Sequence, residues 1–191
     1  MQKRAVETKN KILSAAVELF ASGGMKGTTV DSIAAAAGVN KQRIYAYFGS
    51  KEKLFIAALT FVFKEAEVSA EPMLREAEKS PERLTEILLV HFHSLHENAP
   101  CFWRLLAWAN LEDASLLENL KEVRSKENSS LRRIFEQNCK SPLSFECYLF
   151  SLLAVSWFLK SNAQTLPYTL GFDIQNAAFS QQLFKELSQL F

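Results

Sequence analysis

The stretch TTVDSIAAAAGVNKQRIYAYFGSKEK, residues 28–53, constrains this chain more than any other part of it. Thr28 and Asp31 have the spacing of a helix-start box, in which the threonine hydroxyl accepts a hydrogen bond from the backbone three residues on and the carboxylate reaches back. Gly38 suits the positive φ that ends a helix. The stretch therefore predicts a short helix, a tight turn and a second short helix, which is the spacing of a helix-turn-helix.

The second of these helices, expected over residues 41–48 behind an Asn40 cap, has one apolar face. At about 100° per residue, Ile44 and Phe48 share a stripe that should face inward. The outward surface has donors at its edges and a small residue at its centre, which permits close approach. Glutamine suits adenine, arginine suits guanine and an alanine methyl suits thymine in the major groove. The base-reading candidates are Gln42, Arg43, Tyr45 and Ala46.

Groups that suit DNA phosphates flank this surface. Ser50 can cap a third helix, whose first N–H groups together with Lys51 would meet a phosphate. For Thr28, a purely structural role as a helix cap is an equal alternative. Arg4 lies in a basic start that either touches phosphate or is merely solvated. The phosphate-positioning candidates are Thr28, Thr29, Lys41, Tyr47 and Lys51.

The pattern TTVDSIAAAAGVNKQRIYAYFGSKEKLF resembles the DNA-binding domain of the tetracycline-repressor (TetR) family, and ETKNKILSAAVELFASGG before it resembles that family's first helix. Tyr45, Tyr47 and Phe48 match the family's aromatic recognition-helix ending, whereas Arg43 stands where many members have a small residue. The resemblance implies an all-α fold. An N-terminal three-helix helix-turn-helix DNA-binding domain, residues 1–50, would be joined by a long connector helix to a C-terminal helical ligand-binding and dimerisation domain, residues 51–191.

The same resemblance implies a function. We expect a homodimeric, sequence-specific transcriptional regulator that binds a palindromic double-stranded DNA operator, and we expect a repressor released by a small-molecule effector. The alternative is a DNA-binding regulator or architectural protein without a ligand response. An enzyme is not expected, because the sequence shows no Gly-rich phosphate loop, Ser/His/Asp signature or paired metal motif.

Charge and composition agree with a polyanion partner for the first part of the chain. Net charge is only +1 over 191 residues, but residues 1–55 hold nine Lys/Arg and four Asp/Glu and so carry +5, leaving −4 for the rest. The three cysteines have no paired short spacing and the first residues lack an apolar signal core, so we expect a cytoplasmic protein. The apolar run 149–159 is shorter than the ~20 residues needed to span a bilayer, so no membrane association is expected.

Helical periodicity continues along the chain. The first helix should end at Gly23 and Gly24 and form the floor of the motif, and the connector from Lys51 should end before Pro72. Further helices are expected over 81–98, 101–111, 116–138, 142–165 and 173–191. Apolar residues of the last two helices should pair with their copies in a dimer; they are Tyr148, Leu149, Leu152, Leu159, Ile174, Ala178, Leu183, Leu187 and Leu190.

Aromatic residues of the C-terminal part either line an effector pocket or form an ordinary core. The ligand-binding candidates are Phe61, Phe92, His93, Trp103, Trp108, Tyr148 and Trp157. His91, His93 and His96 point in different directions on a helix and have no second ligand cluster, so we expect neither a bound metal nor a cofactor. An effector wedged among the aromatic residues would tilt the connector and change the spacing of the two recognition helices.

Overall fold

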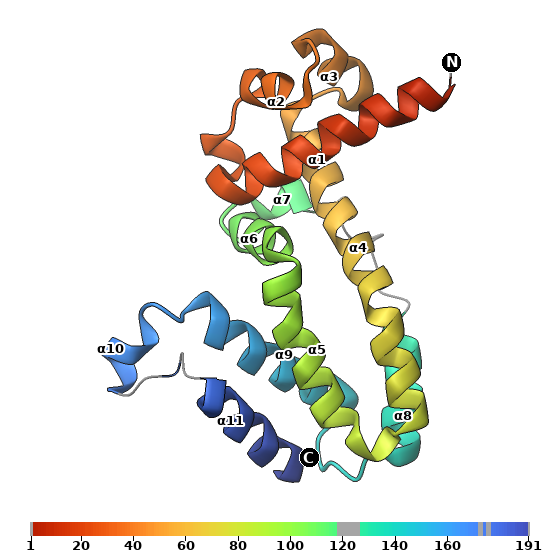
Figure 1. Cartoon of the computed structure of the whole chain (residues 1–191), viewed down its shortest axis with the longest axis vertical. Helices are drawn as coiled ribbons and strands as arrows, with labels where there is room; N and C mark the ends of the chain where they lie inside the picture. Colours follow the sequence, from red (N-terminus) through yellow and green to blue (C-terminus); the bar gives the residue numbers. More distant parts are fainter. Residues whose placement is uncertain (1, 118–126, 172–173, 175–176, 191) are drawn as a thin grey trace. The chain divides into compact units, whose positions relative to one another are not determined.

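Helices joined by short turns and loops make up the part of the chain that the structure describes. The computed structural model describes residues 2–117, 127–171, 174 and 177–190, and no strand occurs among them. The helices of Figure 1 are α1 (Gln2–Gly27), α2 (Val30–Ala37), α3 (Lys41–Phe48), α4 (Lys51–Lys79), the 3₁₀ turn η1 (Pro81–Arg83), α5 (Leu84–Asn98), α6 (Pro100–Ala109), α7 (Ala114–Leu117), α8 (Glu127–Asn138), α9 (Phe145–Ser161), α10 (Leu166–Leu170) and α11 (Ala177–Leu190). The expected all-α class is confirmed. Within the described residues, no helix has the length and apolarity needed to cross a membrane.

The helices form two compact units. The first contains the described residues of 1–66 and 99–124, and the second contains those of 67–98 and 125–191, so α4 contributes to both. The expected division into domains of residues 1–50 and 51–191 stays a prediction.

The first unit is built on α1. Ile12, Ala16 and Phe20 are fully buried, as a floor for the motif requires, and the ring of Phe20 meets that of Phe55 edge-on with centroids 5.1 Å apart. Helix α6 packs along α1 within this unit (Figure 1). Helical geometry breaks at Gly24, where φ is 66° and ψ is 179°, and a last turn then runs to Gly27. The break confirms the expected end of the main helix.

Helix α4 is longer than the sequence predicts. It continues through Pro72 to Lys79, so the expectation that the connector ends before Pro72 was wrong. Proline removes one backbone hydrogen bond and crowds the preceding turn. Ala70, Met73 and Ala77 lie on one buried stripe around Pro72, and each is at most 6% exposed. Burial of that stripe on both sides of the proline offsets its cost.

After α4, several helix ends differ from the expected ones. The helix expected over 142–165 starts at Phe145, because Ser144 Oγ accepts a hydrogen bond from Cys147 N at 3.4 Å, and it ends at Ser161. Of the helix expected over 116–138, α7 and α8 are described, and 118–126 lie outside the described residues. The helix expected over 81–98 begins as the 3₁₀ turn η1 and continues as α5.

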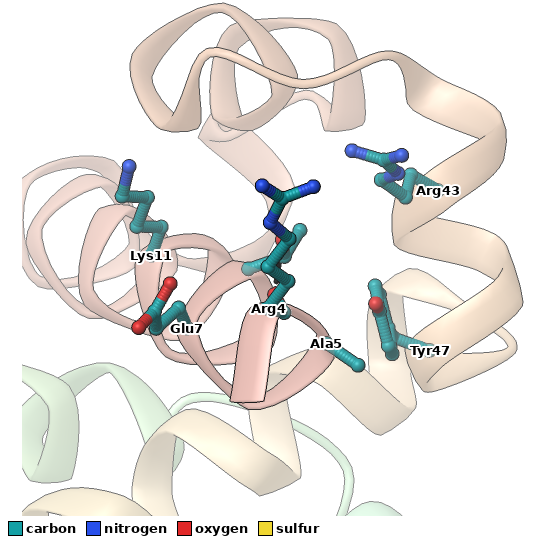
Figure 2. A pocket seen from close by; sticks show the side chains of 7 residues that line it. Arg4, Ala5, Glu7, Lys11, Arg43 and Tyr47 are labelled. Atoms are coloured by element: carbon teal, nitrogen blue, oxygen red, sulfur yellow. Dashed lines mark hydrogen bonds between the residues drawn. The ribbon is translucent and has the colours of Figure 1, made fainter. Parts of the chain in front are cut away.

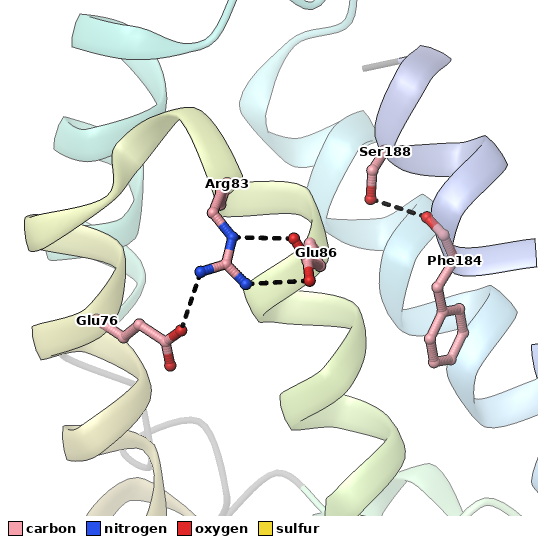
Figure 3. A network of polar contacts seen from close by, with 5 residues as sticks. All are labelled: Glu76, Arg83, Glu86, Phe184 and Ser188. Atoms are coloured by element: carbon pink, nitrogen blue, oxygen red, sulfur yellow. Dashed lines mark hydrogen bonds and ion pairs between the residues drawn. The ribbon is translucent and has the colours of Figure 1, made fainter. Parts of the chain in front are cut away.

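Arg83 ties the turn between α4 and α5 (Figure 3). Its Nε and Nη2 donate to Glu86 Oε2 and Oε1, both at 3.0 Å, and its Nη1 lies 3.9 Å from Glu76 Oε1. The hydrogen bond from Arg83 lowers the pKa of Glu86. Because these side chains are about half exposed, the network orients the turn more than it stabilises the fold.

Three of the nine residues expected to pair between copies are buried inside one chain. Tyr148, Leu152 and Ile174 are at most 4% exposed within a single chain, so their assignment to a dimer interface was wrong. Their side chains form the protomer's own core because α5 packs on α9. The large apolar side chains left exposed on α9 are Phe150 and Phe158.

Candidate nucleic-acid interface

The turn between α2 and α3 is closed by backbone and side-chain caps. Gly38 has φ 64° and ψ 37°, a left-handed conformation, and its N–H reaches the carbonyls of Ala34 and Ala35. Asn40 Oδ1 accepts a hydrogen bond from Arg43 N at 2.9 Å and starts α3 over the expected residues 41–48. The angle between the two helices therefore depends on short-range contacts that the sequence predicts well.

The cap of α2 is Thr29 and not Thr28. Thr29 Oγ1 accepts from Ser32 N at 3.0 Å, whereas Thr28 is 4% exposed and its hydroxyl donates to the Leu19 carbonyl at 3.0 Å. The expected Thr28 to Asp31 box was therefore wrong by one residue. Two adjacent threonines offer the same local pattern, and only the packing of Thr28 against α1 distinguishes them.

Helix α3 presents the expected two faces. Ile44 is 1% exposed and Phe48 is 9% exposed, which confirms the inward stripe. The four base-reading candidates are exposed: Gln42, Arg43, Tyr45 and Ala46. In the described part of the chain, no hydrogen bond or ion pair engages the side chains of Gln42 and Arg43. This outward surface is free to accept an external partner.

The phosphate candidates around that surface differ in exposure and in hydrogen-bond partners. Thr29 is exposed and Tyr47 is half-buried. Lys41 Nζ lies 2.9 Å from Asp31 Oδ2, a hydrogen bond that raises the pKa of Lys41 and keeps it charged. Lys51 Nζ donates to the Thr28 carbonyl at 3.3 Å.

The start of α4 has a cap and a carboxylate. Ser50 Oγ accepts from Lys53 N at 3.2 Å, as expected for the cap of the third helix. The carboxylate of Glu52 is hydrogen-bonded to its own backbone and to Ser50, and both interactions lower the pKa of Glu52. This first-turn side chain is therefore a negative charge near the helix N-terminus. A phosphate approaching this end has to avoid Glu52.

A cleft of about 300 Å³ separates the N-terminal part of α1 from α3. Figure 2 shows the guanidinium groups of Arg4 and Arg43 facing this space from the two helices, with Lys11 further along α1. The lining residues are Arg4, Ala5, Glu7, Thr8, Lys11, Arg43 and Tyr47. The sequence interpretation named Arg4 only as part of a basic start and missed Lys11. Their separation of seven residues, two helical turns, was the signal that could have identified a shared face.

Comparisons with known proteins agree with this geometry. The sequence profile described as "Bacterial regulatory proteins, tetR family" matches residues 12–58. The HTH-type transcriptional repressor NicS of Pseudomonas putida is 31% identical over 180 residues, which cover 90% of this chain and 84% of that protein. The chain belongs to the TetR family. It is a DNA-binding transcriptional regulator, and its relatives are regulators and not enzymes.

Solved structures show the TetR fold over nearly the whole length. The transcriptional regulator SCO4942 from Streptomyces coelicolor has a TM-score of 0.68 at 23% identity and covers 96% of this chain, with 98% of that chain covered. The regulator FadR from Bacillus subtilis, solved in complex with stearoyl-CoA, has a TM-score of 0.68 at 19% identity and covers 96% of this chain, with 99% of its own. These likenesses concern the fold alone.

The seven ligand candidates of this TetR-family chain fall in both units. Phe61, Trp103 and Trp108 lie in the first, and Phe92, His93, Tyr148 and Trp157 lie in the second. Trp108 Nε1 donates to the Ala21 carbonyl at 3.3 Å, and the hydroxyl of Tyr148, which is fully buried, lies 2.9 Å from Thr85 Oγ1. These contacts give both residues packing roles. None of the seven lines the cleft of Figure 2.

Proposed function

We propose that this TetR-family protein is a homodimeric repressor that binds a palindromic operator and is released by a small-molecule effector. The exposed outward surface of α3, with Gln42 and Arg43 free of internal partners, is the observation that carries the proposal. The name of its relative NicS as a repressor supports the direction of regulation. We place the protein in the cytoplasm, with its DNA target.

Helix α3 enters the major groove with its small centre foremost. Arg43 contacts guanine in a bidentate manner and Gln42 contacts adenine, while Ala46 meets a thymine methyl. Tyr45, which is 43% exposed, stands at the edge of the same surface. Each good bidentate pair contributes about 1–3 kcal/mol of discrimination.

Phosphates on both sides of the groove are held by the surrounding groups. Thr29, Lys41, Tyr47 and Lys51 serve one side, and the cleft residues Arg4 and Lys11 extend the contact along α1. Lys41 exchanges its carboxylate partner Asp31 for a phosphate, which an exposed pair does at little cost. Thr28 is left out of this set, because its buried hydroxyl already has a partner.

Dimerisation buries the exposed apolar side chains of α9 and α11. Phe150 is 71% exposed, Phe158 is 55% exposed and Leu190 is 70% exposed. Phe150 and Phe158 are eight residues apart, so they share one face of α9. An isologous two-fold interface at this face brings two α3 helices onto one operator, about one turn (~34–36 Å) apart.

Release follows if the effector favours an arrangement in which the two α3 helices no longer match that spacing. Linkage then requires the operator to weaken effector binding by the same factor, typically ~5–150-fold. Calorimetry of effector binding with and without operator measures that factor. Equal affinities would leave a DNA-binding regulator without a ligand response.

The test of the DNA-binding part is site selection from random DNA with the purified protein, followed by footprinting. We expect a two-fold symmetric consensus whose half-sites lie about one turn apart. The double variant Gln42→Ala/Arg43→Ala should lose the preference for this consensus and keep non-specific binding. A consensus without symmetry, or one recognised equally by the double variant, would contradict the proposed role of α3.

A further inference from the structure

Two side-chain contacts define how α5 and α9 are aligned in the second unit (Figure 1). Thr85 Oγ1 lies 2.9 Å from the hydroxyl of Tyr148, and Lys160 Nζ lies 3.2 Å from Glu97 Oε1. Both pairs are separated by 63 residues in the sequence. The two helices therefore run in the same direction, and residues 63 apart meet at both ends of this stretch.

The same offset defines two layers between these contacts. The offset pairs Leu89 with Leu152, and both are fully buried. One turn further on, this offset pairs His93 with Ser156. The seam consequently has a polar pair, an apolar pair, a second polar pair and an ion pair at intervals of about one turn.

The two polar layers differ in their hydrogen bonds. Thr85 and Tyr148 satisfy each other, whereas His93 Nδ1 and Ser156 Oγ are buried and have no hydrogen-bond partner within the described residues. Ser156 is 0% exposed. Buried polar groups without partners destabilise a fold, and the apolar layer one turn away shows that this seam accommodates leucine. The polar layer of His93 and Ser156 thus gives the isolated protomer no advantage in stability.

An ion pair of Lys160 and Glu97 lies at the outer end of this layer. Burial and then the charge of Lys160 lower the pKa of His93. Burial, Lys160 and His93 lower the pKa of His96 to about 4, so both imidazoles are neutral near pH 7. Glu97, which pairs with Lys160, is 64% exposed and can turn into solvent. An anion placed here would meet the ammonium group of Lys160, the hydroxyl of Ser156 and the neutral imidazole of His93.

An aromatic side chain of α11 lies beside His93. The ring of Phe184 on α11 lies 5.4 Å from the ring of His93 at an interplanar angle of 81°, and Phe184 is 8% exposed. A ligand with a charged end at Ser156 and an apolar body would therefore place that body against an aromatic side chain.

We propose that the layer of His93 and Ser156, together with Lys160, holds the carboxylate of a small organic acid whose apolar part packs against Phe184. The carboxylate replaces Glu97 on Lys160 and accepts a hydrogen bond from the Ser156 hydroxyl. The identification of this acid as the effector rests on the proposed function, whereas the binding site itself does not.

Binding is tested on the full chain with hexanoate and benzoate, and with hexanamide and benzamide as neutral partners of the same shape. Calorimetry and thermal melting should show that at least one acid binds and stabilises the protein, and that its amide binds at least tenfold more weakly. Ser156→Ala should lower the affinity for the acid by roughly 10- to 100-fold. Ser151→Ala is the matched control, because that hydroxyl on the same helix already donates to the Cys147 carbonyl at 2.7 Å. Equal binding of acid and amide, or no binding of either acid, would overturn the proposal.

A second measurement needs no ligand. Ser156→Ala should leave the melting temperature unchanged or raise it, because the removed hydroxyl has no partner to lose. A clear loss of stability would show that the hydroxyl is used inside the protein and would overturn the site.

Operator binding separates this proposal from the proposed function. If an acid binds at Ser156 but leaves operator affinity unchanged, the site is supported and release by this acid is contradicted. If neither acid binds while the operator is bound normally, the site is wrong and the DNA-binding function is unaffected.

Discussion

Gly24 is the position at which one substitution should do most damage to the first unit. Its φ of 66° and ψ of 179° lie in a region that is essentially reserved for glycine. A Cβ at this position would lie 2.7 Å from Trp108 Cε3 and 2.8 Å from Trp108 Cδ2. The indole is also tied to α1 by a hydrogen bond, since its Nε1 donates to the Ala21 carbonyl at 3.3 Å. A shift of the ring away from the added methyl group would strain this hydrogen bond between α6 and α1.

Two separate terms add in the variant Gly24→Ala. The backbone conformation costs a non-glycine residue about 1–3 kcal/mol. Forcing a methyl group into a packed contact costs about 1–3 kcal/mol more. We therefore expect the free energy of unfolding to fall by about 2–6 kcal/mol, a large share of the ~5–15 kcal/mol typical of a protein. For a chain of this length each kcal/mol lowers the melting temperature by roughly 2–4 °C.

Urea denaturation followed by tryptophan fluorescence measures this loss. Gly27→Ala is the control, because a Cβ at Gly27 meets nothing within 4 Å, and its stability should stay within about 1 kcal/mol of the wild type. Adding Gly24→Ala to Trp108→Ala removes the clash and keeps the backbone strain. In that background the substitution should cost only about 1–3 kcal/mol.

The opposite result has a clear meaning. If Gly24→Ala unfolds within about 0.5 kcal/mol of the wild type, α1 has no left-handed break at this position and Trp108 does not pack against it. A full loss that persists in the Trp108→Ala background would assign the whole effect to the backbone.

Three further predictions concern DNA binding, the connector and pH. Arg43→Ala should weaken binding to the selected operator by about 1–3 kcal/mol and relax the preference at one base pair. Lys51→Ala should weaken binding to all DNA sequences alike and lower the salt slope by about one, and titration at several salt concentrations measures both effects. An equal loss of affinity for all sequences in Arg43→Ala would make Arg43 a phosphate contact. Pro72→Ala should raise the free energy of unfolding by up to about 3 kcal/mol, because α4 regains the backbone hydrogen bond to Val68, and a loss in urea denaturation would contradict this. The pKa of His96 is about 4 in the fold against 6.5 for a free histidine, so the unfolded state binds a proton first as pH falls. Stability should therefore decrease from about pH 6.5 to about pH 4. His96→Gln should flatten that decrease in melting experiments.

Much of the local structure was predictable because its causes lie within one or two helical turns. The cap at Asn40, the left-handed turn at Gly38 and the buried stripe of Ile44 and Phe48 all follow from neighbouring residues. The same short-range pattern identifies the TetR family. The exposure of the four base-reading candidates follows from the 3.6-residue period alone, while their contacts with bases stay predictions.

The errors arose where two local solutions were equally good or where distant segments decided the outcome. Thr28 and Thr29 are both good caps, and the hydrogen bond of Thr28 to the Leu19 carbonyl selects the second. Pro72 is a helix breaker by local rules, and the buried stripe on both sides of it keeps α4 intact.

By itself, then, the sequence determined the helical class, the helix-turn-helix and the two faces of its second helix, because backbone caps and periodicity depend on residues close together in the chain. Tertiary structure alone decided that Arg4 and Lys11 share a cleft with Arg43, and that α5 and α9 meet with an offset of 63 residues. The physical reason is that side chains on different helices meet only after those helices pack. Their register is set by the sum of many apolar contacts, which no single stretch of sequence contains.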